Sequence, residues 1–366
     1  MGQNTSKTNK KKINSQNEKK EETNNNNNNY NNNNYNNKDK NKKIINLKNE
    51  NSKISNNNNS NQQNNTFESK YLKKIKVIKQ HSDWIKSVKI FPSGNIISVS
   101  DDETINIYNK NTYELIQKIK NAHLDDIIYI DIKDENNFVT CSYDKTIKTW
   151  IKKIDKFELN YKIEKAHNND IYCVLYYNEN LISCSQDNSI KIWEYVNFKY
   201  QLLTKIIESN DINSMLLLKD KNILISSGYD GTTFYKIYEN GLNINFICNL
   251  KEAFGGCWNG IYRINDNKII VGGEKYLYII LINEKKIFQE IRINFRCNGI
   301  CYNENKKILL VGGWGNDILI YKGDNFEFVE RFENAHFNYI IGFCKMENNL
   351  VLSFSGDWRI IIWSIK

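Results

Sequence analysis

The amino-acid sequence predicts an all-β domain built from repeats, preceded by a tail of low complexity. Segments that share the same order of polar residues recur about every 43 residues, a period typical of repeat architectures. Apolar and polar residues alternate in runs such as NSIKIW and ETINIY, which is the pattern of half-buried strands. No long pattern of helical period occurs after residue 70.

Four segments carry the repeat most clearly, at 81–108, 122–150, 166–193 and 335–363. Each has a His, an apolar run, a second run that contains Ser or Thr, an Asp turn, and a closing run of the T-I-x-I-W type. The aligned positions are His81, Ser98, Asp102 and Tyr108; His123, Thr140, Asp144 and Trp150; His167, Ser183, Asp187 and Trp193; His336, Ser353, Asp357 and Trp363.

The same residue types form hydrolase triads, but their repetition argues against catalysis. All four histidines of the chain fall in this slot, so none remains as a separate catalytic base or metal ligand. We interpret the set as a buried hydrogen-bond chain in which Asp accepts from His, His meets the hydroxyl, and the hydroxyl reaches the indole N–H. The prediction is therefore a protein without catalytic residues, metal site or cofactor; a repeated catalytic triad is the disfavoured alternative.

The segments resemble WD40 repeats, whose four-stranded units assemble into a β-propeller. Degenerate copies at 208–238, 257–282 and 296–321 fill the gap between the clear ones, with Glu208 in place of the His and Glu274 in place of the Asp. The closing residues then fall at 108, 150, 193, 238, 280, 321 and 363, so Tyr238 would close the fourth copy and the ring would have seven blades.

The resemblance also implies how the ring closes. The first strand of such domains typically completes the last blade, and the apolar residues at 71–79 can supply it. We therefore predict a propeller over 67–366, after a tail over 1–66.

Composition restricts the protein classes further. The eight cysteines contain no C-x-x-C pair, which favours reduced thiols in a cytosolic protein over a zinc site or a disulfide framework. The sequence has no apolar run of about 18 residues and no signal-peptide core, so we expect neither secretion nor a membrane span. Twelve lysines and five acids give the tail +7 of the formal +9, which leaves the propeller too weakly basic for a nucleic-acid-binding face.

The tail has two parts. Residues 23–66 are dominated by asparagine and predict a disordered spacer. The start, MGQNTSKTNKKK, fits M-G-x-x-x-[ST], so Gly2 is a candidate for N-myristoylation. The lysines within residues 1–20 would then supply the second signal that a singly acylated protein needs on an anionic membrane. The alternative interpretation of this cluster is a nuclear-localisation or RNA-contacting segment.

The resemblance implies that partners bind the face formed by the loop before the first strand of each blade and by the Asp turn. Four aromatic residues on it come from neighbouring blades six, seven and one and would form an exposed patch of the residue types enriched at binding hot spots. Carried over by position, the candidate face residues are Trp84, Lys86, Asp101, Tyr172, Tyr229, Arg296, Asn298, Trp314, Tyr339 and Trp358.

These observations favour a non-catalytic scaffold or adaptor that binds other proteins or peptides, takes no small-molecule substrate, and lies in the cytoplasm or on the cytosolic side of a membrane. A soluble nuclear or RNA-associated scaffold and a ubiquitin-ligase substrate receptor remain as alternatives. A G-protein β-like subunit is disfavoured because the tail has no heptads for a coiled-coil partner.

Overall fold

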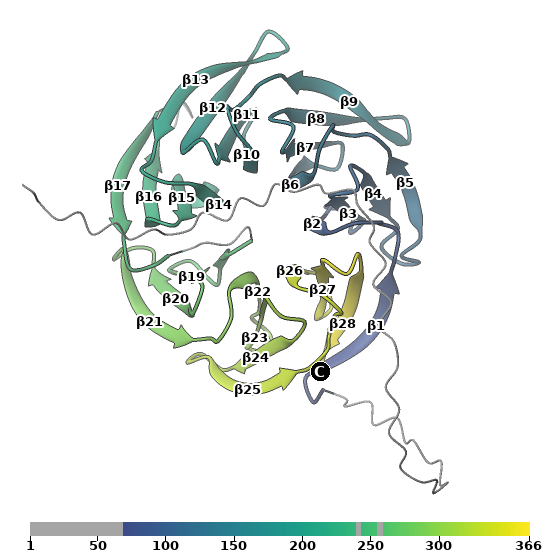
Figure 1. The fold of residues 1–366 in the computed structure, drawn as a ribbon, viewed down its shortest axis with the longest axis vertical. Helices are drawn as coiled ribbons and strands as arrows, with labels where there is room; N and C mark the ends of the chain where they lie inside the picture. The colour runs from purple at the N-terminus through teal and green to yellow at the C-terminus, as the bar shows by residue number, and fades with distance from the viewer. Residues whose placement is uncertain (1–68, 239–242, 255–258) are drawn as a thin grey trace, which may run out of the picture. The chain divides into compact units, whose positions relative to one another are not determined.

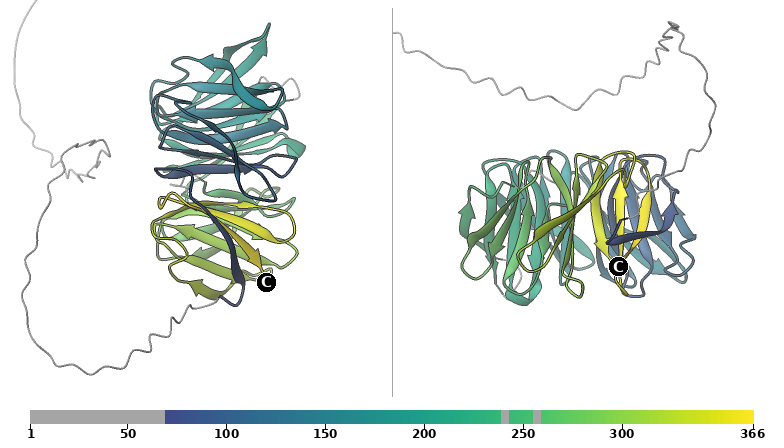
Figure 2. Two further views of the ribbon diagram at one scale, coloured as in Figure 1. Left: turned by 90° about the vertical axis from the view of Figure 1, so that its right-hand side faces the viewer. Right: turned by 90° about the horizontal axis from the view of Figure 1, so that it is seen from below.

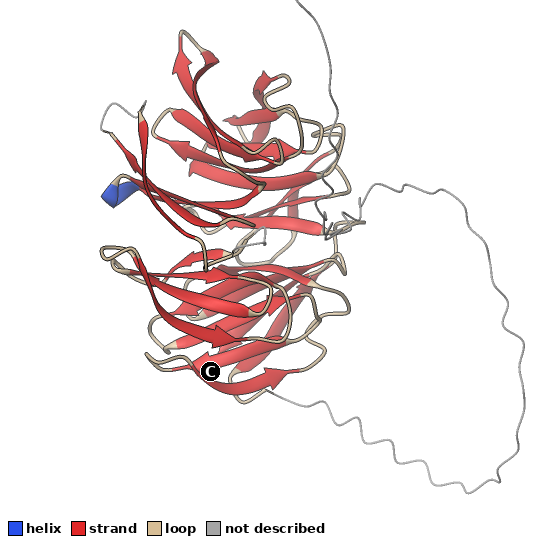
Figure 3. Cartoon of the chain, turned by 60° about the vertical axis from the view of Figure 1, so that its left-hand side comes forward, coloured by secondary structure: helices blue, strands red, loops and turns tan. Residues whose placement is uncertain are grey.

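The computed structural model describes residues 69–238, 243–254 and 259–366. Within these ranges 28 strands form seven four-stranded antiparallel sheets, and the one helical segment is a 3-10 turn, η1 (Lys219–Lys221). Figure 1 shows the sheets as blades around a common axis, Figure 2 shows the propeller edge-on, and Figure 3 shows how strands dominate it. The predicted all-β, seven-bladed fold is confirmed. The acylation, lysine-cluster and spacer predictions concern residues outside these ranges.

Blades one to six each run from the axis outward in chain order (Figure 1). Blades one to three comprise β2 (Ile85–Ile90), β3 (Ile96–Ser100), β4 (Ile105–Tyr108) and β5 (Leu115–Ile119); β6 (Ile127–Asp134), β7 (Asn137–Ser142), β8 (Ile147–Lys153) and β9 (Lys156–Ile163); β10 (Ile171–Tyr177), β11 (Asn180–Ser185), β12 (Ser189–Val196) and β13 (Lys199–Ile207).

Blades four to six, which the sequence supports least, are also four-stranded. They comprise β14 (Ile212–Leu218), β15 (Ile223–Gly228), β16 (Gly231–Ile237) and β17 (Ile244–Leu250); β18 (Ile261–Arg263), β19 (Lys268–Gly272), β20 (Tyr276–Leu281) and β21 (Lys286–Arg292); β22 (Cys297–Asn303), β23 (Ile308–Gly313), β24 (Ile318–Lys322) and β25 (Glu327–Phe332).

The seventh blade joins the two ends of the described propeller. It consists of β26 (Ile340–Lys345), β27 (Leu350–Ser355), β28 (Ile360–Ile365) and, as its outer strand, β1 (Leu72–Ile78). β1 pairs antiparallel with β28 from Leu72, opposite Ile365, to Ile78, opposite Ile360. The Lys366 amide donates to the Tyr71 carbonyl at 2.9 Å, which extends the same pairing. The ring is thus closed by hydrogen bonds between residues far apart in the chain.

The hydrophobic core lies between neighbouring blades. Between blades one and two, Phe91 stacks on Phe157 at 5.3 Å, and Phe138 meets Phe157 edge-on at 5.0 Å. Between blades seven and one, Tyr108 and Phe354 belong to a single buried cluster. Since both faces of a blade are covered by its neighbours, the apolar residues of one blade are buried only when the ring is complete.

The strand register corrects one prediction. In each blade the pairing with the outer strand shifts at the closing residue, between Ile192 and Trp193 in blade three and between Phe234 and Tyr235 in blade four. Tyr235 therefore closes blade four, whereas Tyr238 lies beyond β16 and is half exposed. The prediction of Tyr238 was wrong because the turn between β15 and β16 is tight, with Gly228 paired directly to Gly231.

We predict that a chain beginning at Gln80, which lacks β1, loses the cooperative thermal unfolding of the propeller. Removing β1 exposes the edge of β28 and uncovers the cluster that contains Leu72 and Trp363, both buried. The measurement is circular dichroism during heating. A chain beginning at Ser69 is the control, because it keeps β1 and should unfold as sharply as the full chain. Equal unfolding of the two truncated chains would show that β1 does not hold the ring closed.

Candidate functional site

The aligned polar residues form a hydrogen-bond chain inside the blades. In blade three the Trp193 indole N–H donates to Ser183 Oγ at 2.9 Å, and Ser183 Oγ lies 2.8 Å from His167 Nε2. His167 Nδ1 lies 3.0 Å from Asp187 Oδ1. Because the indole can only donate, the hydroxyl must donate onward to Nε2, and the imidazole then donates from Nδ1 to the carboxylate. This one direction satisfies every group.

Blades two and seven repeat the arrangement. The indole-to-hydroxyl distances are 2.9 Å for Trp150 to Thr140 and 2.8 Å for Trp363 to Ser353. The imidazole contacts are 2.8 Å for His123 to Thr140 and 2.7 Å for His336 to Ser353, with Asp144 and Asp357 at 3.0 Å from the other ring nitrogen.

Blades one and four carry variants of this chain. In blade one the Tyr108 hydroxyl replaces the indole and lies 3.4 Å from Ser98 Oγ, while His81 bonds Ser98 at 2.7 Å and Asp102 at 2.9 Å. In blade four Glu208 takes the histidine position. Its Oε1 accepts from Ser226 Oγ at 2.7 Å and from the Tyr235 hydroxyl at 2.5 Å. The carboxylate thus joins the two strands directly, and this role of Tyr235 was not apparent from sequence spacing.

The protonation states follow from burial and from these bonds. Burial lowers the pKa of His123 below its ordinary value, although its hydrogen bond to Asp144 acts in the opposite direction. For Asp144, burial would raise the pKa, but the bonds from His123, the Leu124 amide and Thr146 together hold it well below its ordinary value. The pair is therefore a neutral imidazole and an ionised carboxylate, the same states that the donor directions require.

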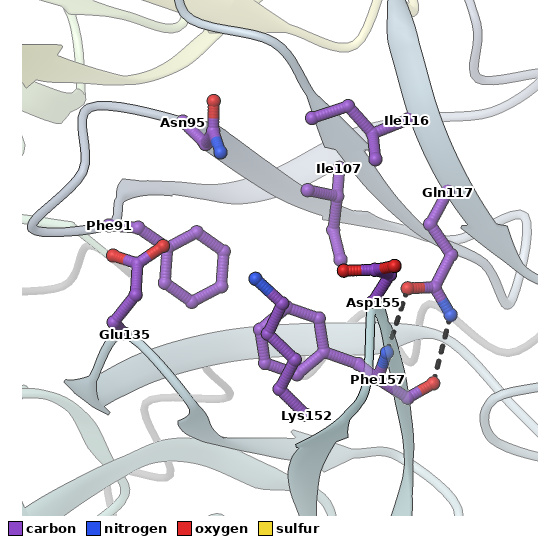
Figure 4. Close-up of a pocket in the computed structure, with 9 residues that line it drawn as sticks. All are labelled: Phe91, Asn95, Ile107, Ile116, Gln117, Glu135, Lys152, Asp155 and Phe157. Carbon is purple, nitrogen blue, oxygen red and sulfur yellow. Dashed lines mark hydrogen bonds between the residues drawn. The ribbon is translucent and has the colours of Figure 1, made fainter.

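These hydrogen-bond chains serve the structure of the blades. His123 and Thr140 have no exposed surface, so a substrate has no access to them. A pocket between blades one and two encloses only about 40 Å³ and is lined by Phe91, Asn95, Ile107, Ile116, Gln117, Glu135, Lys152, Asp155 and Phe157 (Figure 4). Gln117 closes one side of it through two 2.9 Å bonds to the Phe157 backbone. That volume accommodates a few water molecules at most, far below the few hundred Å³ of typical ligand sites.

The surface around one end of the axis is built differently. In five blades, the residue that follows the second strand donates its backbone N–H to the carbonyl oxygen of the residue that precedes the first strand. This bond places the two residues side by side in each of these blades. We call this surface the mouth face. Its pairs are Trp84 and Asp101, Asp126 and Tyr143, Asp170 and Gln186, Arg296 and Trp314, Tyr339 and Gly356; the corresponding positions in blade four are Asp211 and Tyr229.

Aromatic rings gather on blades six, seven and one of the mouth face. Trp314 stacks on Tyr339 with centroids 5.7 Å apart, and Trp84 meets Tyr339 edge-on at 6.0 Å. We call these three residues the aromatic cluster. A Cβ on Gly356 would lie 3.1 Å from the Trp84 ring, so the absence of a side chain there lets the indole lie over blade seven. Trp314 and Tyr339 remain 45% and 38% exposed, which leaves ring surface open to a partner.

The remaining predicted face residues divide into exposed and buried ones. Trp358 and Tyr229 are exposed, and Arg296 lies 5.2 Å over the Trp314 ring while its Nη2 donates to the Tyr229 hydroxyl at 3.3 Å. By contrast, Lys86, Tyr172 and Asn298 are buried. Their prediction as contact residues was wrong: each is the second residue of an inner strand, at a β-bulge that turns it into the propeller. Among the described residues, no ring contact joins Trp358 to the aromatic cluster.

Carboxylates occupy the other part of the mouth face. Asp101, Asp126, Asp170 and Asp211, from blades one to four, form what we call the acidic arc. Burial raises the pKa of Asp101 to about 7 against the lowering effect of Lys86, and Asp126 and Asp83 raise it further. Burial is also the main reason that the pKa values of Asp170 and Asp211 are raised.

Comparison with known proteins identifies the repeat. The family model described as "WD domain, G-beta repeat" matches residues 72–109, 114–150 and 158–194. This chain carries WD40 repeats. Each matched WD40 segment begins with the outer strand of one blade and continues through the three inner strands of the next, as the closure by β1 requires.

A curated relative shares part of the sequence. The chain is 40% identical over 72 residues to "Lissencephaly-1 homolog 1" of Paramecium tetraurelia. The match covers 19% of this chain and 18% of the relative, so it spans less than a fifth of either protein.

In the part of the chain that the structure describes, no group of three or more His, Cys, Asp or Glu side chains is placed to hold a metal ion. The seven cysteines in these ranges are free thiols. None of the described helical segments is long and apolar enough to cross a bilayer.

We predict that Thr140→Val destabilises the propeller by about 2–4 kcal/mol, because the substitution leaves the Trp150 indole N–H and His123 Nε2 buried without partners. Urea unfolding at neutral pH measures the loss. Thr140→Ser is the matched control: it keeps the hydroxyl and should cost about 1 kcal/mol or less. Equal losses for the two variants would show that the hydroxyl bridge contributes little.

Proposed function

We propose that this WD40 propeller is a non-catalytic scaffold that binds a protein or peptide partner through the mouth face. The observation that carries the proposal is the aromatic cluster. WD40 propellers generally serve as interaction scaffolds, which supports the same conclusion. Stacked rings that remain partly open to solvent offer a rigid apolar contact with little conformational entropy to lose, and such residues dominate the energetics of many interfaces.

The non-catalytic part of the proposal is supported by the state of the histidines. Each of the four has its Nδ1 bound to an Asp and its Nε2 bound to a hydroxyl, and all four are buried. A general base must reach the proton that it removes. These imidazoles are used for folding, so none of them is available as a general base at the mouth face.

We further propose that the tail tethers the scaffold to the cytosolic side of a membrane. The support is the match of Gly2 and Ser6 to the acylation pattern, together with the lysines that follow within residues 1–20. One acyl chain binds a bilayer only marginally, and a basic cluster near an anionic leaflet supplies the additional attraction.

Partner binding is expected to depend on the aromatic cluster. In cells that express the tagged full chain, we expect Trp314→Ala to remove a specific subset of the proteins that co-purify with wild type, since the truncation deletes half of the stacked pair. Phe288→Ala is the matched control, because Phe288 is 56% exposed on the outer strand β21. Quantitative mass spectrometry measures the difference. Loss of the same proteins with both variants, or with neither, would count against the mouth face.

Membrane attachment is expected to depend on Gly2. Wild type should enter the membrane fraction of lysed cells, and Gly2→Ala should shift most of the protein to the soluble fraction because alanine is not acylated. Ser6→Ala is a second variant, which changes the acylation pattern but keeps the acceptor glycine. If wild type and Gly2→Ala fractionate alike, the lysine cluster becomes a candidate nuclear or RNA-directed signal.

A further inference from the structure

The mouth face combines two features that lie side by side. The aromatic cluster covers blades six, seven and one, and the acidic arc covers blades one to four. They meet at blade one, where Trp84 and Asp101 share one backbone hydrogen bond of 3.0 Å. A ligand that crosses this boundary meets ring faces on one side and carboxylates on the other.

The protein itself shows what kind of group fits between a ring and a carboxylate. Lys86 Nζ lies 4.9 Å from the Trp84 ring centroid and 3.0 Å from Asp101 Oδ2, so one ammonium group interacts with both. Arg296 shows that cations also lie against aromatic rings alone on this face, because its guanidinium is 5.2 Å from the Trp314 ring centroid and 6.0 Å from that of Tyr229. Aromatic faces attract cations through their quadrupole, more strongly when water is excluded.

Asp126 raises the pKa of Asp101, so these two carboxylates of the arc repel each other. Burial, together with Tyr172, Asp101, Asp170 and Asp126, raises the pKa of the Tyr143 hydroxyl, so three carboxylates of the arc act on one point. Burial outweighs the lowering effects of Lys86 on Asp101 and of Lys145 on Asp170, so the pKa values of both carboxyls stay above their ordinary values. Lys86 pairs with Asp101 Oδ2, whereas Asp101 Oδ1 is buried and has no hydrogen-bond partner among the described residues.

We propose that the partner bound at the mouth face is a peptide segment whose arginine or lysine side chains lie between the aromatic cluster and the acidic arc. This inference rests on the proposed function, because it specifies the chemistry of the partner for the same surface. Charge complementarity selects a cationic segment over an acidic or purely apolar one, and the surface of Trp314 and Tyr339 that remains exposed provides its apolar contact.

The test uses the full-length chain and a fluorescent Gly/Ser peptide that carries three arginines, compared with the same peptide carrying three glutamines. We expect the arginine peptide to bind at least tenfold more tightly in fluorescence anisotropy. Tyr339→Ala should weaken its binding about tenfold. The double variant Asp126→Asn, Asp170→Asn should weaken it by a similar factor, because the arc loses two charges while its side-chain shapes are kept.

A charge-matched control separates recognition from general attraction. Glu158→Gln with Glu290→Gln removes two carboxylates from the exposed outer strands β9 and β21 and should leave the affinity unchanged. Equal weakening by both double variants, or equal binding of the two peptides, would overturn the proposal. The capture experiment with Trp314→Ala is independent: if it succeeds while the arginine peptide fails to bind, the mouth face binds a partner of another chemistry.

The lysines of the tail are the competing occupant. A full-length chain with Lys10→Gln, Lys11→Gln and Lys12→Gln should bind the arginine peptide as wild type does. If these substitutions raise the affinity about tenfold, the mouth face is occupied by the protein's own tail, and the proposal of an external cationic partner is wrong.

Discussion

The pairing of β1 with β28 is the constraint on which the propeller depends. The core lies between blades, so the apolar residues of each sheet remain uncovered until its two neighbours are in place. Closing the ring with an outer strand from the opposite end of the domain makes the last interface as continuous as the others. The matched WD40 segments reflect this, since each spans parts of two blades. The sequence repeat is offset by one strand from the structural blade. Each repeat therefore supplies strands to two neighbouring blades and links them.

Within this ring, the polar chains and the mouth face have complementary roles. The chains from indole to carboxylate lie buried in blades two, three and seven, with variants in blades one and four. They are fully paired, which makes those blades rigid. The aromatic cluster draws two of its members from blades with such a chain and Trp314 from blade six, which has none. Blade six therefore contributes to the proposed binding surface beside blade seven, whose buried polar residues are fully paired.

Much of the fold was predictable, because the repeat restricts every element at once. The period, the four histidines and the alternating strands determine the number of blades, and the chain with Trp193, Ser183, His167 and Asp187 follows from residue types that must be paired when buried. Tyr235 was missed because a shortened turn shifts the register without leaving a gap in the sequence pattern. Lys86 and Tyr172 were misplaced because a β-bulge, which spacing alone does not reveal, turns them inward.

The contacts on the mouth face lay beyond sequence reasoning for a related reason. Trp314 and Tyr339 belong to consecutive blades, but Trp84 comes from blade one, near the other end of the domain. Its edge-on contact with Tyr339 therefore depends on the ring being closed at β1. The acidic arc likewise gathers one residue from each of four repeats, none of which is unusual alone. A binding surface assembled in this way is lost as a unit when the ring opens. Stability of the propeller and recognition at its mouth face are therefore coupled through β1, although β1 contributes no residue to that surface.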